Sequence, residues 1–130
     1  MAFIFSNNLY RSVEARQLCK AVGIKMVPSA LVVQMAQKAG FDALFIDMEH
    51  STLSIHETSQ MCTAGLLAEV TPFVRVPHQC GNGLIQKVLD GGAMGVIFPH
   101  IDSKGRSRAG GKTSSGNIIL QTHTATIRLS

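Results

Sequence analysis

Short apolar segments alternate with helical stretches of roughly 10 to 15 residues along the chain, and this alternation restricts the fold more than any other feature of the sequence. The apolar segments predict strands at residues 21–27, 41–48, 71–76 and 95–98. A first helix is expected at residues 6–19, and further helices between successive strands. Such an order is typical of a parallel sheet with helices packed against it, which is an α/β fold.

Several residues mark where these helices should begin and end. Pro28 suits the first position of the second helix, and Gly40 is expected to end it. Ser54 and Glu57 have the spacing of a capping box at the start of the third helix. The pair Gly91-Gly92 is expected to end the fourth.

The strands are apolar along their centres, without polar alternation, which predicts a sheet buried on both faces. Four strands are about half of those in a closed (β/α)8 barrel, which typically needs about 250 residues. If the sheet belongs to such a barrel, roughly its first half is present.

The positive charge is concentrated at one end of the sequence. Residues 1–103 contain seven Lys and Arg against eight acids, whereas residues 104–130 contain five Lys and Arg and no acid. The composition therefore predicts an α/β segment over 1–103 and an atypical basic, Gly/Ser-rich tail over 104–130, with strand-like stretches at 117–120 and 125–129. The first segment gives no electrostatic reason to expect a nucleic-acid partner, and polyanion binding by the tail is a weaker alternative.

Composition also bears on the compartment. No apolar run is long enough to cross a bilayer, and no signal peptide is recognised at the start, so no membrane partner is expected. The three cysteines are widely spaced and form no C-x-x-C pair, which favours free thiols in a reducing compartment. A cytoplasmic protein is predicted.

Polar side chains gather where the predicted strands end, which is where parallel α/β folds build their sites. Asp47 and His50 follow one strand, and Arg75 interrupts the next. A carboxylate can orient an imidazole that acts as a general base, and a guanidinium can bind a substrate carboxylate or an enolate oxygen. In the alternative, Asp47 caps a loop beside a surface His50, and Arg75 forms an ion pair with Asp47 or Asp90.

The residues suggest two other sites. His50, His78 and His100 all follow strands, which allows a three-imidazole metal site, although similar strand exits explain them more simply. Residues 105–113 resemble a phosphate-binding loop, but the spacing of the first glycine is wrong by one residue.

Three motifs, in matching order and spacing, resemble the HpcH/HpaI aldolase family, and its fungal members in particular. They are AGFDALFIDMEHS at residues 39–51, TPFVRVP at 71–77 and VLDGGAMGVIFPH at 88–100. The resemblance covers residues from about 7 to 103. It implies a (β/α)8 TIM-type barrel, of which this chain would hold about the first four β/α units.

Family membership also implies a site and a reaction. Carried over by motif, His50 would be a base that works through water, Asp47 would orient it, Arg75 would steady the keto or enolate oxygen, and Asp90 would lie towards a subunit interface. The implied enzyme is a lyase that reversibly cleaves 4-hydroxy-2-keto acids to pyruvate and an aldehyde. The resemblance further implies a homo-oligomer and a divalent cofactor, Mg²⁺, Mn²⁺ or Co²⁺, that acts as a Lewis acid.

The sequence departs from the family in the residues that bind the metal. The family's ligands are a Glu and an Asp from later strands, and after Asp102 this chain has no acidic residue. No metal ligand is therefore assigned, and Glu49 is not the family's ligand. The chain is expected to be a truncated form that binds the metal weakly and has little or no activity alone. A non-catalytic half-barrel that acts as an association module is the alternative.

Overall fold

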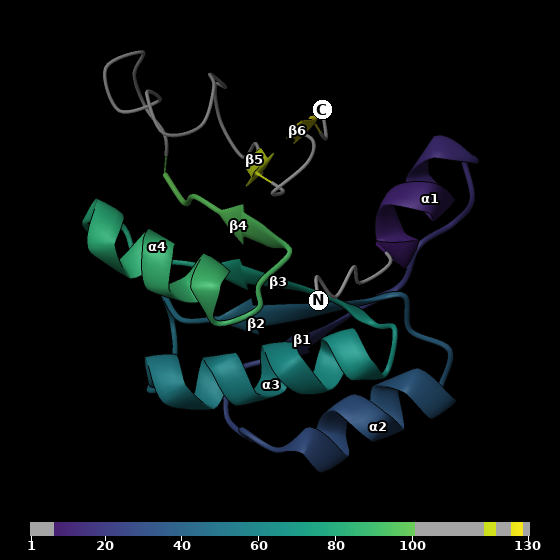
Figure 1. The fold of residues 1–130 in the computed structure, drawn as a ribbon, viewed down its shortest axis with the longest axis horizontal. Coiled ribbons are helices and arrows are strands. Elements are labelled where there is room, and N and C mark those ends of the chain that lie inside the picture. The colour runs from purple at the N-terminus through teal and green to yellow at the C-terminus, as the bar shows by residue number, and fades with distance from the viewer. Residues whose placement is uncertain (1–6, 101–118, 122–125, 129–130) are drawn as a thin grey trace, which may run out of the picture.

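The computed structural model describes residues 7–100, 119–121 and 126–128. Its sheet has the order β1-β2-β3-β4-β5-β6, in which the first four strands are parallel (Figure 1). The strands are β1 (Ala21–Ile24), β2 (Ala43–Asp47), β3 (Thr71–Arg75), β4 (Gly95–Ile97), β5 (Ile119–Gln121) and β6 (Thr126–Arg128). The strand order follows the chain order, as expected of successive β/α units of a barrel.

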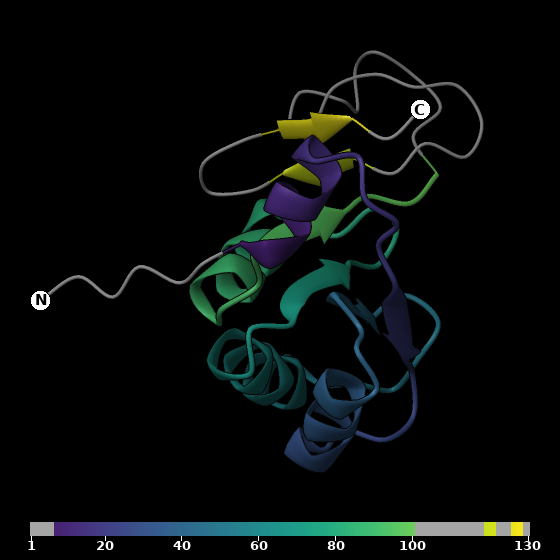
Figure 2. The ribbon, with the colours of Figure 1, turned by 90° about the vertical axis from the view of Figure 1, so that its right-hand side faces the viewer.

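The helices lie on both sides of this sheet. They are α1 (Asn8–Glu14), α2 (Ala30–Lys38), α3 (Ile55–Leu67) and α4 (Asn82–Asp90). α2 and α3 pack side by side against one face (Figure 1), whereas α1 lies on the opposite side (Figure 2). The predicted α/β fold, a partial (β/α) barrel with parallel strands, is confirmed. None of the helices in the described ranges has the length and apolar character needed to cross a bilayer.

The predicted helix boundaries are confirmed in the main. Ser54 and Glu57 form the capping box of α3, with the Ser54 hydroxyl accepting the Glu57 N–H and the Glu57 carboxylate accepting the Ser54 N–H. Gly40 and Gly92, which follow α2 and α4, have φ angles of 75° and 110°. Glycine adopts this left-handed backbone without steric cost, so it suits the residue just past a helix.

Two helix starts differ from the prediction. α2 begins at Ala30, not at Pro28, because the Ser29 hydroxyl accepts the N–H of Leu31 and makes Ser29 the N-cap. α1 begins at Asn8 after the cap Asn7 and is only seven residues long. The chain leaves the helix where Arg16 takes a φ of 52°, so the predicted continuation to residue 19 is wrong.

The face of the sheet under α2, α3 and α4 holds the main core. Leu44, Ile46, Val74 and Val96 alternate along β2, β3 and β4, and all are fully buried. The opposite face is covered less completely. There Ile97 packs with Tyr10, Phe45 and Phe73, and the two phenylalanine rings meet edge to face at 5.7 Å between centroids.

The prediction that both faces are buried therefore holds for the helix-covered face. Phe45 and Phe73 remain partly exposed, because Tyr10 is the only helical side chain that packs on this cluster within the described part of the chain. This second face corresponds to the inside of a barrel, and its side chains at the strand ends form the site described below.

The tail contributes two antiparallel strands to the sheet. β5 pairs with β4, and β6 pairs with β5. They overlap the stretches predicted to be strand-like at 117–120 and 125–129. The boundary predicted after residue 103 and the phosphate-loop candidate at 105–113 fall outside the described residues, so the division into 1–103 and 104–130 stays a prediction.

Replacing Gly65 by alanine is expected to destabilise the fold. A Cβ at Gly65 in α3 would lie 2.8 Å from the Val70 carbonyl oxygen and 2.9 Å from a methyl group of Leu44. We expect Gly65→Ala to lower the free energy of unfolding by about 1–3 kcal/mol, measured by urea denaturation. In α4, a Cβ at Gly83 meets nothing within 4 Å. The matched change Gly83→Ala should raise stability by up to about 1 kcal/mol, and equal effects of the two changes would contradict the packing.

Cys62 predicts a pH dependence of stability. Burial in α3 raises the pKa of its thiol from its ordinary value to about 12. Above pH 9 the unfolded chain releases this proton while the folded chain retains it, so the free energy of unfolding falls as the pH rises towards 12. Cys62→Ala lacks this titration and carries only a pH-independent cavity cost. The difference in the free energy of unfolding between wild type and Cys62→Ala should become smaller from pH 8 to pH 10. A difference that stays constant over this range would contradict the burial of the thiol.

Candidate functional site

The ends of β2 and β3 place two opposite charges side by side. Asp47 and Arg75 are direct partners in the register of the two parallel strands. They follow Phe45 and Phe73 at the two-residue spacing of a strand, so they share the inner face with those rings. The guanidinium of Arg75 also lies over the Phe45 ring, 5.4 Å from its centroid.

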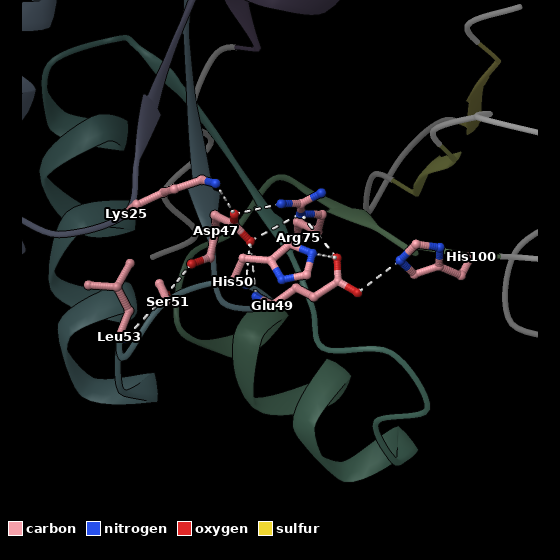
Figure 3. A network of polar contacts seen from close by, with 8 residues as sticks. All are labelled: Lys25, Asp47, Glu49, His50, Ser51, Leu53, Arg75 and His100. Atoms are coloured by element: carbon pink, nitrogen blue, oxygen red, sulfur yellow. Dashed lines mark hydrogen bonds and ion pairs between the residues drawn. The ribbon is translucent and has the colours of Figure 1, made fainter.

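Asp47 and Arg75 form a bidentate ion pair (Figure 3). Arg75 Nε donates to Asp47 Oδ1 at 3.0 Å, and Nη2 donates to Oδ2 at 2.6 Å. Burial alone would raise the pKa of Asp47, but the hydrogen bonds from Arg75 and from the backbone N–H groups of His50 and Glu49 hold the pKa well below its ordinary value. The same hydrogen bond with Asp47 raises the pKa of Arg75. Both groups are therefore charged at neutral pH.

The Asp47 carboxylate also shapes the loop that follows β2. Its Oδ1 accepts the backbone N–H groups of Glu49 at 3.0 Å and His50 at 3.2 Å, and its main-chain oxygen accepts the Ser51 hydroxyl. The alternative in which Asp47 caps a loop and Arg75 pairs with it therefore describes the contacts correctly. Asp47 orients His50 through its backbone, whereas the predicted contact with the imidazole is absent among the described residues.

Glu49 lies at the centre of the network, although sequence reasoning gave it no role. Its side chain is only 7% exposed. Its Oε2 lies 3.4 Å from both His50 Nε2 and Arg75 Nε, and its Oε1 lies 3.4 Å from His100 Nε2. Oε2 has no hydrogen-bond partner within the described part of the chain. Its position two residues after Asp47 could have marked Glu49 as a candidate site residue, but the burial of its side chain could not be predicted from the sequence.

Lys25 is a second residue without a predicted role. It follows β1, and its Nζ lies 3.4 Å from Asp47 Oδ2 with 55% of the side chain exposed. The site thus draws on the exits of β1, β2, β3 and β4, which meet at one edge of the sheet (Figure 3).

The histidines predicted as a three-imidazole site are only partly brought together. Glu49, His50 and His100 form the group of potential metal ligands found in the described ranges, with ligand atoms all within 4.8 Å of one another. His78 is not a member of this group. Its ring packs edge-on against the His100 ring, with centroids 5.4 Å apart.

Asp90 lies apart from this cluster. It is the last residue of α4, is exposed, and precedes the start of β4, whereas Asp47 and Arg75 lie where β2 and β3 end. The described chain does not bring Asp90 together with them. Its expected role towards a subunit interface stays a prediction.

The geometry predicts that Asp47 and Arg75 depend on each other for stability. Removing one partner of a buried pair leaves an uncompensated charge and costs about 3–5 kcal/mol, so Asp47→Asn and Arg75→Gln should each destabilise strongly. A double-mutant cycle by urea denaturation should give a coupling of about 1–3 kcal/mol. Lys25→Gln removes a solvent-exposed contact with the same carboxylate and should cost less than about 1 kcal/mol. A coupling near zero would contradict the bidentate pair.

Comparison with known proteins identifies the relatives of the chain. The family model described as HpcH/HpaI aldolase/citrate lyase matches residues 27–110. A 4-hydroxy-4-methyl-2-oxoglutarate aldolase of Hapsidospora irregularis is 57% identical over 81% of this chain and 39% of its own length. One of Chaetomium globosum is 55% identical over 82% of this chain and 40% of its own. The chain thus spans about two fifths of the length of these fungal relatives.

Solved structures show the same fold. The citrate synthase SbnG superposes with a TM-score of 0.71 at 25% identity, over 80% of this chain and 42% of that one. An HpcH/HpaI aldolase from Desulfitobacterium hafniense gives a TM-score of 0.70 at 24% identity, over 75% of this chain and 38% of that one. Because the family model matches more than half of the sequence, the chain belongs to the HpcH/HpaI aldolase/citrate lyase family.

Proposed function

We propose that the chain carries the proton-transfer and enolate-binding part of a carbon–carbon lyase that cleaves 4-hydroxy-2-keto acids to pyruvate and an aldehyde or ketone. The observation that carries the proposal is the guanidinium of Arg75, fixed by Asp47 beside the imidazole of His50. Arg75 Nε and His50 Nε2 both lie 3.4 Å from the same oxygen of Glu49. Names of the fungal relatives suggest 4-hydroxy-4-methyl-2-oxoglutarate as the substrate.

Arg75 is suited to hold the 2-keto oxygen. Its Nε and Nη2 are engaged by Asp47, while no protein group in the described ranges binds Nη1. A substrate oxygen at Nη1 would meet a fixed positive charge that needs no reorganisation as the enolate forms. Asp47 is a positioning residue in this scheme, because it acts on the substrate only through Arg75 and through the backbone of His50.

His50 is proposed to move the proton. Its side chain is 59% exposed at the strand-end edge, so a substrate or a water molecule can reach it. Through water, His50 takes the proton of the C4 hydroxyl, and the C3–C4 bond breaks as C4 becomes a carbonyl. The electron pair moves to the enolate of pyruvate, whose oxygen lies at Arg75. The same proton returns to C3 and completes pyruvate.

The family generally depends on a divalent metal, and the described residues offer one group of possible ligands. This group holds one carboxylate and two imidazoles. Mg²⁺ requires octahedral ligation by oxygen, so this donor set does not fit it. The steps above use only side chains of the chain. We expect the chain alone to cleave the carbon–carbon bond of the substrate slowly or not detectably, while its side chains still exchange the methyl protons of pyruvate.

A role as a non-catalytic association module is favoured by a separate observation. β1 lies at the edge of the described sheet, and several large apolar side chains are exposed in α2 and in the segments that flank β1 in the sequence. They are Leu18, Met26, Val27, Leu31 and Met35. Unpaired strand edges and exposed apolar surface favour association. Homo-oligomers in size-exclusion chromatography, without any of the chemistry tested below, would support this second function.

Deuterium exchange into the methyl group of pyruvate tests the proton transfer directly, because it is the reverse of the final step. We expect the full chain to accelerate the exchange above the buffer rate, followed by proton NMR in D₂O. His50→Gln should reduce the accelerated rate by about 10²-fold or more. Arg75→Lys should also reduce it, because one ammonium cannot replace the planar fork that Asp47 holds.

His56→Gln is the matched control, since His56 is an exposed histidine of α3 outside the network. It should exchange at the wild-type rate. Exchange at the buffer rate by the wild type, or equal loss in His50→Gln and His56→Gln, would reject the assignment.

Pyruvate release from 4-hydroxy-4-methyl-2-oxoglutarate with added Mn²⁺ is expected to be far slower than by the Hapsidospora irregularis relative, and a comparable rate would contradict the expected low activity.

Binding of a small 2-keto acid follows from the proposed chemistry. Assembly into a homo-oligomer would give Asp90 a partner surface, and a cytoplasmic location agrees with three free cysteines.

A further inference from the structure

We propose that Glu49, His50 and His100 form a binding site for a first-row transition-metal ion such as Zn²⁺. The three side chains come from the exits of β2 and β4, on either side of Arg75. Figure 3 shows the Glu49 carboxylate between the two imidazole rings. This site differs in position in the sequence and in donor chemistry from the oxygen ligands expected to hold Mg²⁺ in the family.

The first support is the spacing of the ligand atoms. His50 Nε2 lies 3.4 Å from Glu49 Oε2, and His100 Nε2 lies 3.4 Å from Glu49 Oε1, both beyond the usual range of a hydrogen bond. Ligand atoms around a tetrahedral Zn²⁺ with bonds of about 2.0–2.1 Å are separated by about 3.4 Å. All three ligand atoms lie within 4.8 Å of one another, so a small rotation of the imidazoles would close them around one ion.

The second support is the state of the Glu49 carboxylate. Its side chain is more than nine-tenths buried, and its Oε2 has no hydrogen-bond partner in the described part of the chain. A buried carboxylate oxygen in that state is costly, and a bound cation would remove the cost. Arg75 donates its two hydrogen bonds to Asp47 and only approaches Glu49, with Nε 3.4 Å from Oε2, so the Glu49 carboxylate accepts no hydrogen bond from it.

The third support is accessibility combined with orientation. The side chains of His50 and His100 are 59% and 63% exposed, so an ion can reach them from solvent. His100 has a left-handed backbone with a φ of 51°, which is unusual for a residue with a side chain. Its ring packs edge-on against that of His78, with the centroids 5.4 Å apart.

The donor set selects the ion. Two imidazole nitrogens and one carboxylate oxygen suit Zn²⁺, Co²⁺, Ni²⁺ and Cu²⁺, whereas Mg²⁺ and Ca²⁺ prefer oxygen ligands alone. Three protein ligands leave a position for water or another small ligand. If His50 is the base, which rests on the proposed function, a bound ion would occupy its nitrogen and inhibit proton transfer.

Direct binding tests the site without any assay of activity. We expect Zn²⁺ to bind the full chain with one-to-one stoichiometry in calorimetry, at least about 10²-fold more tightly than Mg²⁺. Zn²⁺ should shift the imidazole proton signals of His50 and His100 in NMR spectra. Co²⁺ should give visible d–d absorption without the near-ultraviolet band of a thiolate ligand.

His100→Gln should weaken Zn²⁺ binding at least about tenfold, and His56→Gln should leave it unchanged. Because the His100 side chain is exposed, its loss should not unfold the chain, and circular dichroism checks this. Glu49→Gln, which keeps the size of the buried side chain, should weaken binding as well. Equal affinity in wild type and His100→Gln, a thiolate band with Co²⁺, or comparable affinities for Zn²⁺ and Mg²⁺ would overturn the proposal.

Discussion

Two neighbouring parallel strands bring opposite charges to the same level of the sheet, and the arrangement of the site depends on the pair they form. Asp47 is fully buried at the end of β2, where an isolated carboxylate would be strongly destabilising. The bidentate contact with Arg75 at the end of β3 compensates that charge, and two backbone N–H groups of the following loop complete its hydrogen bonding. The loop carrying Glu49 and His50 is thereby tied to both strands.

The ion pair between Asp47 and Arg75 also sets the positions of the remaining polar groups of the site. Because Asp47 engages two nitrogens of Arg75, the guanidinium is held with Nη1 directed away from the pair, and Glu49 is left between Arg75 and two imidazoles. Glu49 and His50 follow Asp47 directly in the chain, yet their environments differ sharply. The glutamate side chain is buried at the centre of the network, and the histidine is open to solvent. One strand end thus supplies a fixed charge, a buried carboxylate and an accessible imidazole.

The sequence predicted the fold closely because the fold depends on local patterns. Apolar segments spaced by helical stretches specify parallel strands, and the Ser54–Glu57 box and Gly40 mark helix ends through contacts only a few residues apart. The errors were also local. Pro28 was expected to be the first residue of the second helix, but Ser29 is its N-cap and the helix begins at Ala30. The first helix ends earlier than expected, near Arg16. Neither error changed the order or direction of the strands.

The site was predictable only in part. The sequence alone determined that Asp47, His50 and Arg75 lie at strand exits, since their positions follow from the apolar runs before them. Only the tertiary structure decided which groups touch. Strand register set Asp47 opposite Arg75, and the return of the chain through β4 brought His100 to Glu49, 51 residues away along the sequence. Burial and contact of this kind depend on distances between segments remote in the chain, and no local pattern of residues encodes those distances.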